Sequence, residues 1–212
     1  AQFDLGWMYK KGEGVAQDYK EAVKWWKLAA EQEHAKAQFN LGRIYDQGRG
    51  VPEDDKEAVK WYRLAAEQGH ATAQKNLGWM YDKGKGVPED DKEAVKWYRL
   101  SAEQGNAKAQ SNLGLMYHNG DGVPQDYKEA VRLFRLAAEQ GLAIAQKNLG
   151  GMYQFGHGVP QDDKEAFRLM RLSAEQGNAI AQNNLGMMYE FGQGVQEDDK
   201  EAVRLYRLAA EQ

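Results

Sequence analysis

The chain has 212 residues, of which 42% are hydrophobic and 11% aromatic, and its formal net charge is −4. So small a charge gives no reason to expect nucleic acid or an anionic membrane as a partner. The absence of cysteine excludes disulfide frameworks, thiolate metal sites and cysteine nucleophiles. No apolar run approaches the roughly 20 residues of a membrane span, and no signal peptide opens the chain. The cytoplasm, the bacterial periplasm and secretion all stay open as compartments.

The dipeptide Ala-Gln recurs along the chain with a fixed spacing of 36 residues. It begins at Ala1, Ala37, Ala73, Ala109, Ala145 and Ala181. Such a period is typical of repeat proteins, in which each unit contacts mainly its neighbours and the core is extended. We therefore expect a single solenoid domain over residues 1–212, with repeats 1–36, 37–72, 73–108, 109–144, 145–180 and 181–212.

Each unit begins with a segment that has the period of an amphipathic helix. In the third unit this segment spans residues 73–84, and Ala73, Leu77 and Met80 share one face with Tyr81. A glycine at the sixth position of the unit costs about 1 kcal/mol inside a helix relative to alanine. Because that glycine returns in every unit, we expect close approach of a second helix there.

A Gly-x-Gly-Val-Pro segment, residues 48–52 in the second unit, then ends the first helix and turns the chain. Asp54, followed by Glu57, resembles a capping box and predicts a second helix that runs to the Glu67-Gln68 pair. Gly69 stands where a C-terminal cap is needed, whereas Glu33 replaces it in the first unit and should loosen that turn. The apolar face of this helix comprises Ala58, Trp61, Tyr62, Ala65 and Ala66.

The six units fall into two triplets with slightly different cores. One position of the second helix is tryptophan in the first three units and leucine in the last three. The residues are Trp25, Trp61 and Trp97, then Leu133, Leu169 and Leu205. We attach no function to this difference.

The repeated pattern, AQxxLGxxYxxGxGVPxDxxKEAxxWYxxAAEQGxAxA, closely resembles the Sel1-like repeat, a relative of the tetratricopeptide repeat. The resemblance covers the whole chain. It implies an all-α fold, a right-handed α/α superhelical solenoid of six 36-residue helix-turn-helix repeats whose first helices line the concave side. It also implies scaffold or adaptor work between proteins. Some exported bacterial members are rich in disulfides, and their properties do not carry over to a chain without cysteine.

Asparagines recur at the fourth position of the unit, on the face of the first helix opposite its core stripe. An amide has both donors and an acceptor, so a row of amides can pair with an extended peptide backbone. The alternative is that each asparagine satisfies a backbone group in a neighbouring turn. The candidate partner-binding residues of this row are Asn40, Asn76, Asn112, Asn148 and Asn184.

Large side chains at the seventh position face away from the same core stripe. Exposed apolar side chains often mark interaction sites. The alternative is that they pack only against adjacent helices. The candidate partner-binding residues are Trp7, Arg43, Trp79, Leu115 and Met187, extended by Phe155 and Phe191.

The remaining charged and histidine patterns do not indicate a nucleic-acid-binding, metal-binding or catalytic site. Basic side chains such as Lys56, Lys60 and Arg63 are flanked by carboxylates, which favours a solvated, salt-bridged face over a nucleic-acid track. His34 and His70, expected to face solvent, lack a third ligand for a metal. Every candidate acid is repeated as a helix cap, so we expect no enzyme, no cofactor and no metal.

Two functions remain from different classes. The leading one is a protein-interaction scaffold that binds a peptide or a partner protein in the concave groove. The alternative is a structural or self-assembling repeat module, natural or consensus-like, without a dedicated ligand. The apolar flanks of the first and last helices suggest end-to-end self-association. The identity of the partner cannot be read from the residues.

Overall fold

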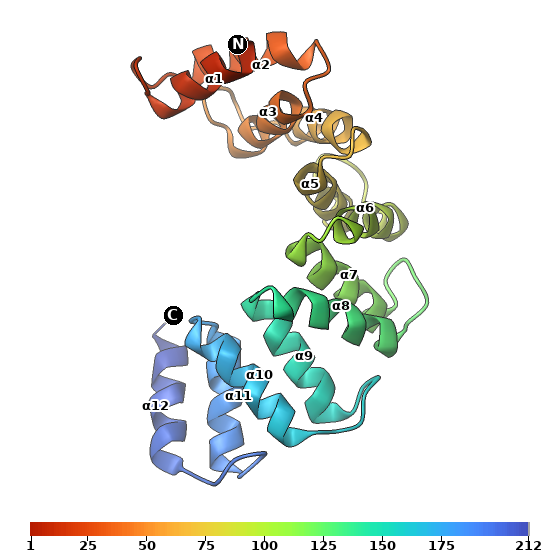
Figure 1. Cartoon of the computed structure of the whole chain (residues 1–212), viewed down its shortest axis with the longest axis vertical. Coiled ribbons are helices and arrows are strands. Elements are labelled where there is room, and N and C mark those ends of the chain that lie inside the picture. Colours follow the sequence, from red (N-terminus) through yellow and green to blue (C-terminus); the bar gives the residue numbers. More distant parts are fainter. Residues whose placement is uncertain (212) are drawn as a thin grey trace. The chain divides into compact units, whose positions relative to one another are not determined.

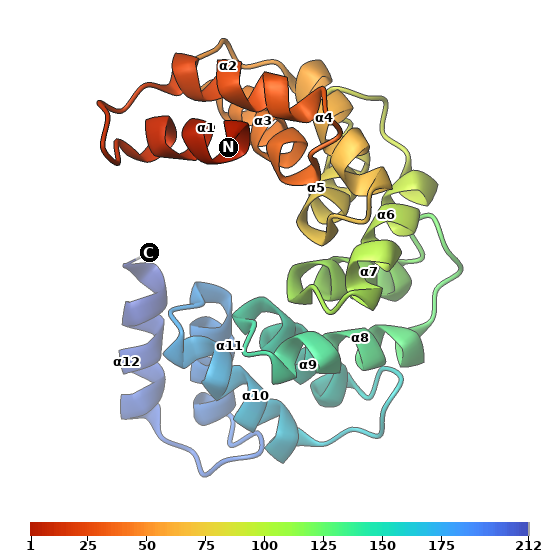
Figure 2. The ribbon, with the colours of Figure 1, turned by 45° about the horizontal axis from the view of Figure 1, so that its top comes forward.

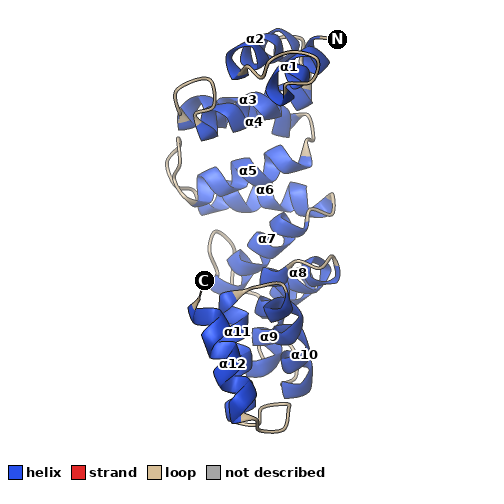
Figure 3. Ribbon diagram, turned by 90° about the vertical axis from the view of Figure 1, so that its left-hand side faces the viewer, coloured by secondary structure: helices blue, strands red, loops and turns tan. Residues whose placement is uncertain are grey.

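The computed structural model describes residues 1–211, and these form twelve α-helices and no strand (Figure 3). The first six, in chain order, are α1 (Gln2–Lys11), α2 (Tyr19–Ala30), α3 (Ala35–Gln47), α4 (Asp55–Glu67), α5 (Ala71–Asp82) and α6 (Asp91–Glu103). The others are α7 (Ala107–Asn119), α8 (Tyr127–Glu139), α9 (Ala143–Phe155), α10 (Asp163–Glu175), α11 (Ala179–Glu190) and α12 (Asp199–Ala210). The predicted all-α solenoid of helix-turn-helix repeats is confirmed.

The contacts divide the chain into two compact units, residues 1–106 and 107–212. The boundary falls between the third and fourth repeats, where tryptophan gives way to leucine in the second helix. Each unit thus contains one of the two triplets that the sequence distinguishes. The expectation of a single domain stays a prediction.

Within each unit the helices form antiparallel pairs that stack on one another (Figures 1 and 2). We call α1, α3, α5, α7, α9 and α11 the A helices, and the even-numbered helices the B helices. Each A helix packs against the B helix that follows it, and, inside a unit, each B helix packs against the next A helix. The core stripe predicted for the third repeat is buried, with Ala73, Leu77 and Met80 almost without exposed surface and Tyr81 half-buried.

The glycine at the sixth position lets the A and B helices of one repeat approach closely, as predicted. A Cβ atom on Gly42 would lie 2.5 Å from Cδ1 of Tyr62, well inside van der Waals contact. The equivalent glycines face Trp26, Tyr98, Phe134, Met170 and Tyr206. The cost of glycine in a helix is therefore offset by the burial of one large side chain per repeat.

The A-helix residue opposite that large side chain depends on whether the large side chain carries a hydroxyl group. Where it is tyrosine, the A helix provides a carboxylate: the Tyr62 hydroxyl donates to Asp46 at 3.3 Å. Tyr98 donates to Asp82 at 3.2 Å in the same way. The Tyr206–Glu190 pair repeats this arrangement. In the other repeats the position holds Lys10, His118 and Gln154. Phe134 and Met170 have no donor, and the indole N–H of Trp26 donates instead to the carbonyl oxygen of Phe3 at 3.1 Å. The pairing follows from the cost of a buried hydroxyl without a partner.

Inside each unit, the glutamine of the Ala-Gln dipeptide ties a repeat to the one before it. Gln38 is buried, and its Nε2 donates to the carbonyl oxygen of Ala30 in the preceding B helix at 3.2 Å. Its Oε1 accepts from Nε2 of Gln68, at the end of its own repeat's B helix, at 2.6 Å. Both ends of the buried amide are thereby satisfied. The spacing of 36 residues repeats this bridge, which explains why the dipeptide marks the period.

Each B helix begins with the predicted aspartate cap. Asp54 Oδ1 accepts from the backbone N–H groups of Lys56 and Glu57, both at 3.0 Å. The backbone N–H of Asp54 donates to the carbonyl oxygen of Tyr45, which joins the start of the B helix to the preceding A helix. Glu57 instead pairs with Lys60 at 3.3 Å. The start is thus half of a capping box.

Candidate functional site

The large side chains at the seventh position lie on the exposed side of the A helices. Trp7, Trp79, Leu115 and Met187 are each exposed by more than a third of their surface. Phe155 and Phe191, one turn further along their helices, are the most exposed of the large apolar side chains. The four side chains at the seventh position are therefore not sealed between helices, and packing against adjacent helices without a ligand stays the alternative. Their role in binding a partner stays a prediction.

The asparagine row is less exposed than the sequence suggests. For Asn40 the expected exposure is wrong: only 6% of its surface is exposed, because it lies in a recess beside the larger Trp26 and Arg43. Asn76, Asn112, Asn148 and Asn184 are half-buried. The Asn76 side chain hydrogen-bonds the Tyr62 hydroxyl of the preceding repeat and partly offsets the rise in the pKa of Tyr62 that burial causes. At that position the amide has a structural contact, although its partner is a side-chain hydroxyl and not the backbone group of the alternative.

In the first unit, an open recess of about 420 Å³ lies over α1, α3 and the start of α5. It brings together three of the predicted residues, Trp7, Asn40 and Arg43. The ammonium of Lys10 lies 4.4 Å from the centre of the Trp7 ring. Burial, followed by the charges of Arg43, Lys11 and Arg49, lowers the pKa of Lys10. The lining of the recess itself contains the aromatic rings of Phe3 and Phe39 and the basic side chains of Lys36 and Arg43, together with one carboxylate, Asp4.

The two histidines of the first unit serve as helix caps. Nδ1 of His34 accepts from the backbone N–H of Ala37, and Nδ1 of His70 accepts from that of Ala73. His70 also stacks on Phe39, with the ring centres 4.5 Å apart. The expectation that both face solvent holds for His34, but it is wrong for His70, which this stacking half-buries.

In the second unit, a recess of about 540 Å³ lies over α7, α9 and α11. It brings together five of the predicted residues: Leu115, Asn148, Phe155, Asn184 and Met187. Ile180, an exposed residue at the start of α11, forms part of its rim. Four predicted residues are not among those that line either recess: Asn76, Trp79, Asn112 and Phe191.

Sequence reasoning missed two residues that shape the second recess. Lys147 lines it, and burial lowers the pKa of its ammonium group. Gly151 occupies the seventh position of its repeat, where a Cβ atom would meet no other atom within 4 Å. A signal for Gly151 was present, because a small residue stands there in a row of large ones. No such signal marks Lys147, because its burial and its lack of a carboxylate partner depend on neighbours from adjacent repeats.

The B helices also expose an apolar row that the sequence analysis did not identify. Leu64 and Leu100 in the first unit and Leu136 in the second are each exposed by slightly more than a third. The basic residues around this row are engaged locally, as expected for a salt-bridged face. Lys60 pairs with Glu57, and the Arg63 guanidinium donates to the Tyr81 hydroxyl of the next repeat.

Among residues 1–211, none of the helices has both the length and the apolar character required to cross a membrane. In the same described part of the chain, no group of three or more histidine, cysteine, aspartate or glutamate side chains is placed to hold a metal ion.

The stacked helix pairs and the recesses over the A helices define an all-α repeat protein of the solenoid class. The chain belongs to the Sel1 repeat family. The family's repeat matches residues 1–34, 35–70, 71–106, 107–142, 143–178 and 179–212. Sel1 repeat proteins generally mediate protein–protein interactions, and the family is generally non-catalytic. No curated protein matches the chain.

Several solved structures share this fold. One is c5321, described as a protective antigen present in uropathogenic Escherichia coli strains, with 43% identity and a TM-score of 0.91 over 99% of this chain. The match covers 45% of c5321, so the chain spans less than half of that protein. A Sel1 repeat protein from Oxalobacter formigenes has 39% identity and a TM-score of 0.88, with coverage of 98% and 83%. The immunity protein Pa5087 of Pseudomonas aeruginosa, at 21% identity, has a TM-score of 0.57 over 98% of this chain and 81% of its own.

Proposed function

We propose that this chain is a protein-interaction scaffold that holds an extended segment of a partner protein against its A helices. The observation that carries the proposal is the coincidence of both recesses with the exposed side chains at the seventh position. Exposed apolar side chains around a recess provide the buried anchors on which most binding energy depends. The general role of Sel1 repeat proteins in protein–protein interaction supports the same function.

A peptide can follow the A helices because the repeat spacing suits an extended chain. Packed helices lie about 8–10 Å apart, and an extended peptide advances about 3.3 Å per residue. One repeat therefore corresponds to roughly three peptide residues within a unit. The half-buried amides of Asn112 and Asn184 are available to the peptide backbone, and the apolar side chains select among peptide side chains.

The test uses a random peptide library displayed on phage and selected against the whole chain. The dissociation constant of a recovered peptide is then measured by fluorescence polarisation for two variants of the second unit. Leu115→Ala changes an A helix, and Leu136→Ala changes a B helix; both leucines are 37% exposed, so the pair is matched in size and exposure. We expect Leu115→Ala to weaken binding at least about fivefold and Leu136→Ala by less than twofold.

An equal effect of the two variants, or a larger effect of Leu136→Ala, would reject the A-helix surface. The same comparison in the first unit uses Trp79→Ala on an A helix and Leu100→Ala on a B helix. Circular dichroism verifies that helical content is unchanged. Failure to select any peptide that binds the chain would reject the scaffold function itself.

A self-assembling module is the second candidate, and one observation favours it. Val203 on α12 is exposed, whereas the equivalent Val59 and Val131 are buried under the next repeat. We propose that a second copy of the chain can cover this surface. Sedimentation equilibrium of the chain over a range of concentrations tests this proposal.

A further inference from the structure

The recess of the second unit exists because one repeat lacks a side chain. The seventh position holds a large side chain in every other repeat, and the neighbours of Gly151 in this row are Leu115 and Met187. A Cβ atom on Gly151 would enter open space, so no neighbouring side chain fills the gap. The recess has a volume of about 540 Å³, and the space that a side chain at Gly151 would occupy is part of it.

The walls and rim of this recess are apolar. Leu115 on α7 and Met187 on α11 flank the gap at Gly151, and Met152 and Phe134 form part of its lining. Phe155, 66% exposed, and Ile180, 60% exposed, stand at its rim without a covering side chain. Burial of a large apolar side chain from a partner would remove this surface from water. A phenylalanine or leucine side chain suits such a hollow.

Two hydrogen-bond donors of the recess lack an acceptor. The Nδ2 atom of Asn148 is buried and has no hydrogen-bond partner among the described residues. Lys147 forms none of the ion pairs seen for other lysines, such as that of Lys60 with Glu57. Burial alone lowers the pKa of Lys147, with no carboxylate opposing it. A buried donor and a partly buried cation are both costly without an anionic partner.

The recess itself offers no anion. None of the described residues that line it is aspartate or glutamate, and the other titratable groups there are His118 and His157. Lys147 precedes Gly151 by four residues on α9, so the two positions lie on the same face of the helix, about one turn of 5.4 Å apart, and both line the recess. Consecutive peptide residues have Cα atoms 3.8 Å apart, so neighbouring groups of a ligand can reach both.

We propose that this recess binds a peptide segment in which a large apolar side chain adjoins a carboxylate, with the apolar side chain over Gly151 and the carboxylate held by Lys147 and Asn148. This inference rests on the proposed scaffold function and names the chemistry of its ligand. The carboxylate has two possible sources, an aspartate or glutamate side chain or the C-terminus of the partner. Both present the same oxygen atoms to the two donors, and the experiment separates them.

The probes are four acetylated peptides titrated into the whole chain and followed by ¹H–¹⁵N NMR. The first has phenylalanine followed by aspartate in a glycine context with an amidated C-terminus, and the second replaces the aspartate by asparagine. The third ends in phenylalanine with a free carboxylate, and the fourth is its amide. We expect at least one acidic peptide to bind about tenfold more tightly than its neutral counterpart, with shifts at Gly151 and Ile180. The acidic peptide that binds identifies the source of the carboxylate.

Three variants separate the charge from the hollow. Lys147→Met should weaken the acidic peptide about tenfold, to the level of its neutral counterpart. Lys128→Met removes the same charge from an exposed position of α8 outside the recess, and it should leave binding unchanged. Gly151→Leu should abolish binding of all four peptides by filling the hollow, without loss of helical content.

Several outcomes would overturn the inference. Equal affinity for acidic and neutral peptides, or no effect of Lys147→Met, would remove the anion site. If library-selected peptides still distinguish Leu115→Ala from Leu136→Ala in that case, the scaffold function survives. Binding of dodecanoate at the recess without binding of any of the four peptides would assign it to a small amphipathic acid instead. Absence of shifts for all four peptides at millimolar concentration would equally reject the proposal.

Discussion

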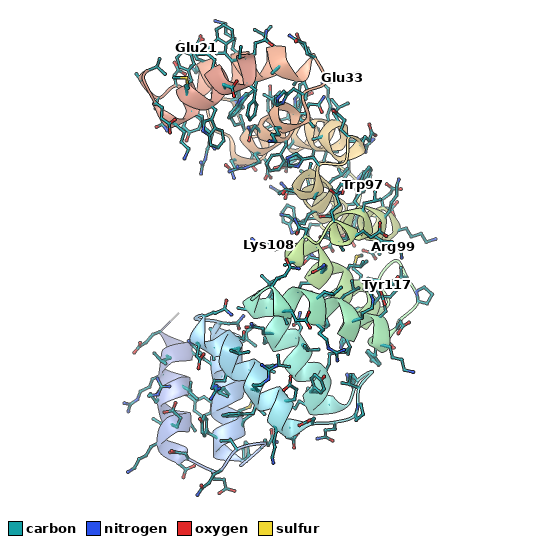
Figure 4. The ribbon with its side chains drawn as sticks, viewed as in Figure 1. Glu21, Glu33, Trp97, Arg99, Lys108 and Tyr117 are labelled. Atoms are coloured by element: carbon teal, nitrogen blue, oxygen red, sulfur yellow. The ribbon has the colours of Figure 1, made fainter. Side chains whose placement is uncertain are left out.

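One residue of the first repeat adopts a backbone conformation that disfavours its side chain. Glu33 has a φ of 59° in the turn after α2 (Figure 4), where the later repeats have glycines such as Gly69, with a φ of 82°. The left-handed conformation costs a residue with a Cβ atom about 1–2 kcal/mol. A Cβ at Gly69 would meet no atom within 4 Å, so the cost arises from the backbone and not from crowding. The prediction that Glu33 loosens its turn is thereby given a physical basis.

We therefore expect Glu33→Gly to raise the free energy of unfolding by roughly 0.5–1 kcal/mol, because the gain at the left-handed residue exceeds the extra flexibility of glycine in the unfolded chain. Urea unfolding followed by circular dichroism measures this change. Gly69→Glu is the reverse substitution in the second repeat and should lower the same free energy by a similar amount. Two changes of the same sign would contradict the explanation.

His70 links stability to pH through its role as a cap. Burial lowers the pKa of its imidazole below the usual value, assisted by the positive charge of Lys36. Nδ1 must be unprotonated to accept from the backbone N–H of Ala73. Between the folded-state pKa and about 6.5 the unfolded chain binds more protons than the folded chain. This contribution to stability is therefore complete above about pH 6.5 and is lost as the pH falls through the folded-state pKa.

The comparison with His70→Asn isolates this effect, because asparagine caps a helix without titrating, as Asn178 does for α11. We expect the parent chain to lose stability relative to this variant between pH 7.5 and pH 5. Urea unfolding at both values measures the difference, and carboxylates shared by the two proteins cancel. A difference that does not change with pH would show that His70 stays unprotonated or does not act as the cap.

At the scale of the helix, the glycines of the A helices have two distinct reasons to be there. Gly42 permits contact with the buried ring of Tyr62, whereas Gly151 contacts nothing and opens a recess. Alanine at Gly42 would overpack the core, which typically costs about 1–3 kcal/mol. Alanine at Gly151 would only improve helix propensity, by about 1 kcal/mol.

We therefore predict opposite changes for two formally identical substitutions. Gly42→Ala should lower the free energy of unfolding by about 1–2 kcal/mol, and Gly151→Ala should raise it by up to about 1 kcal/mol. Chemical unfolding measures both. Stabilisation by Gly42→Ala would mean that Tyr62 moves aside at little cost, against the close approach that the structure shows. Destabilisation by Gly151→Ala would contradict the open recess.

At the scale of the whole molecule, both ends of the chain expose residues that are buried in other repeats. Val203 is 48% exposed, whereas Val59 is 4% exposed in a cluster that includes the next A helix. Met8 on α1 is likewise exposed, while the equivalent Met80 is buried against the preceding repeat. Apolar surface of this kind favours contact with another copy.

We predict that the 212-residue chain associates weakly, so that its average mass rises with concentration in sedimentation equilibrium. Val203→Lys should reduce this association, because a charge would be buried in the contact. The control is Lys200→Ala, at an exposed position of the same helix as Val203, and it should have little effect. Val23→Lys is not a suitable control, because Val23 is buried in the core. A constant monomer mass over the full range would reject self-association.

Much of the fold follows from the sequence because its causes are local and repeated. The helix pairs, the aspartate caps, the turn glycines and the close approach at the sixth position each depend on a few neighbouring residues or on one repeat. Each of these features recurs in several of the six repeats, so the sequence shows it more than once. The binding site was predicted only in part: the exposure of Trp7, Leu115 and Met187 follows from helix periodicity, but the burial of Asn40 does not.

The sequence by itself determined the period, the helices and the family, because helix periodicity and turn chemistry act over a few residues. Only the tertiary structure decided that Gln38 bridges two repeats, that Gly151 leaves a hollow and that Lys147 stands without a carboxylate. These properties depend on groups of neighbouring helices, 8 and 30 residues from Gln38 in the case of its bridge, that come together only when the helices stack.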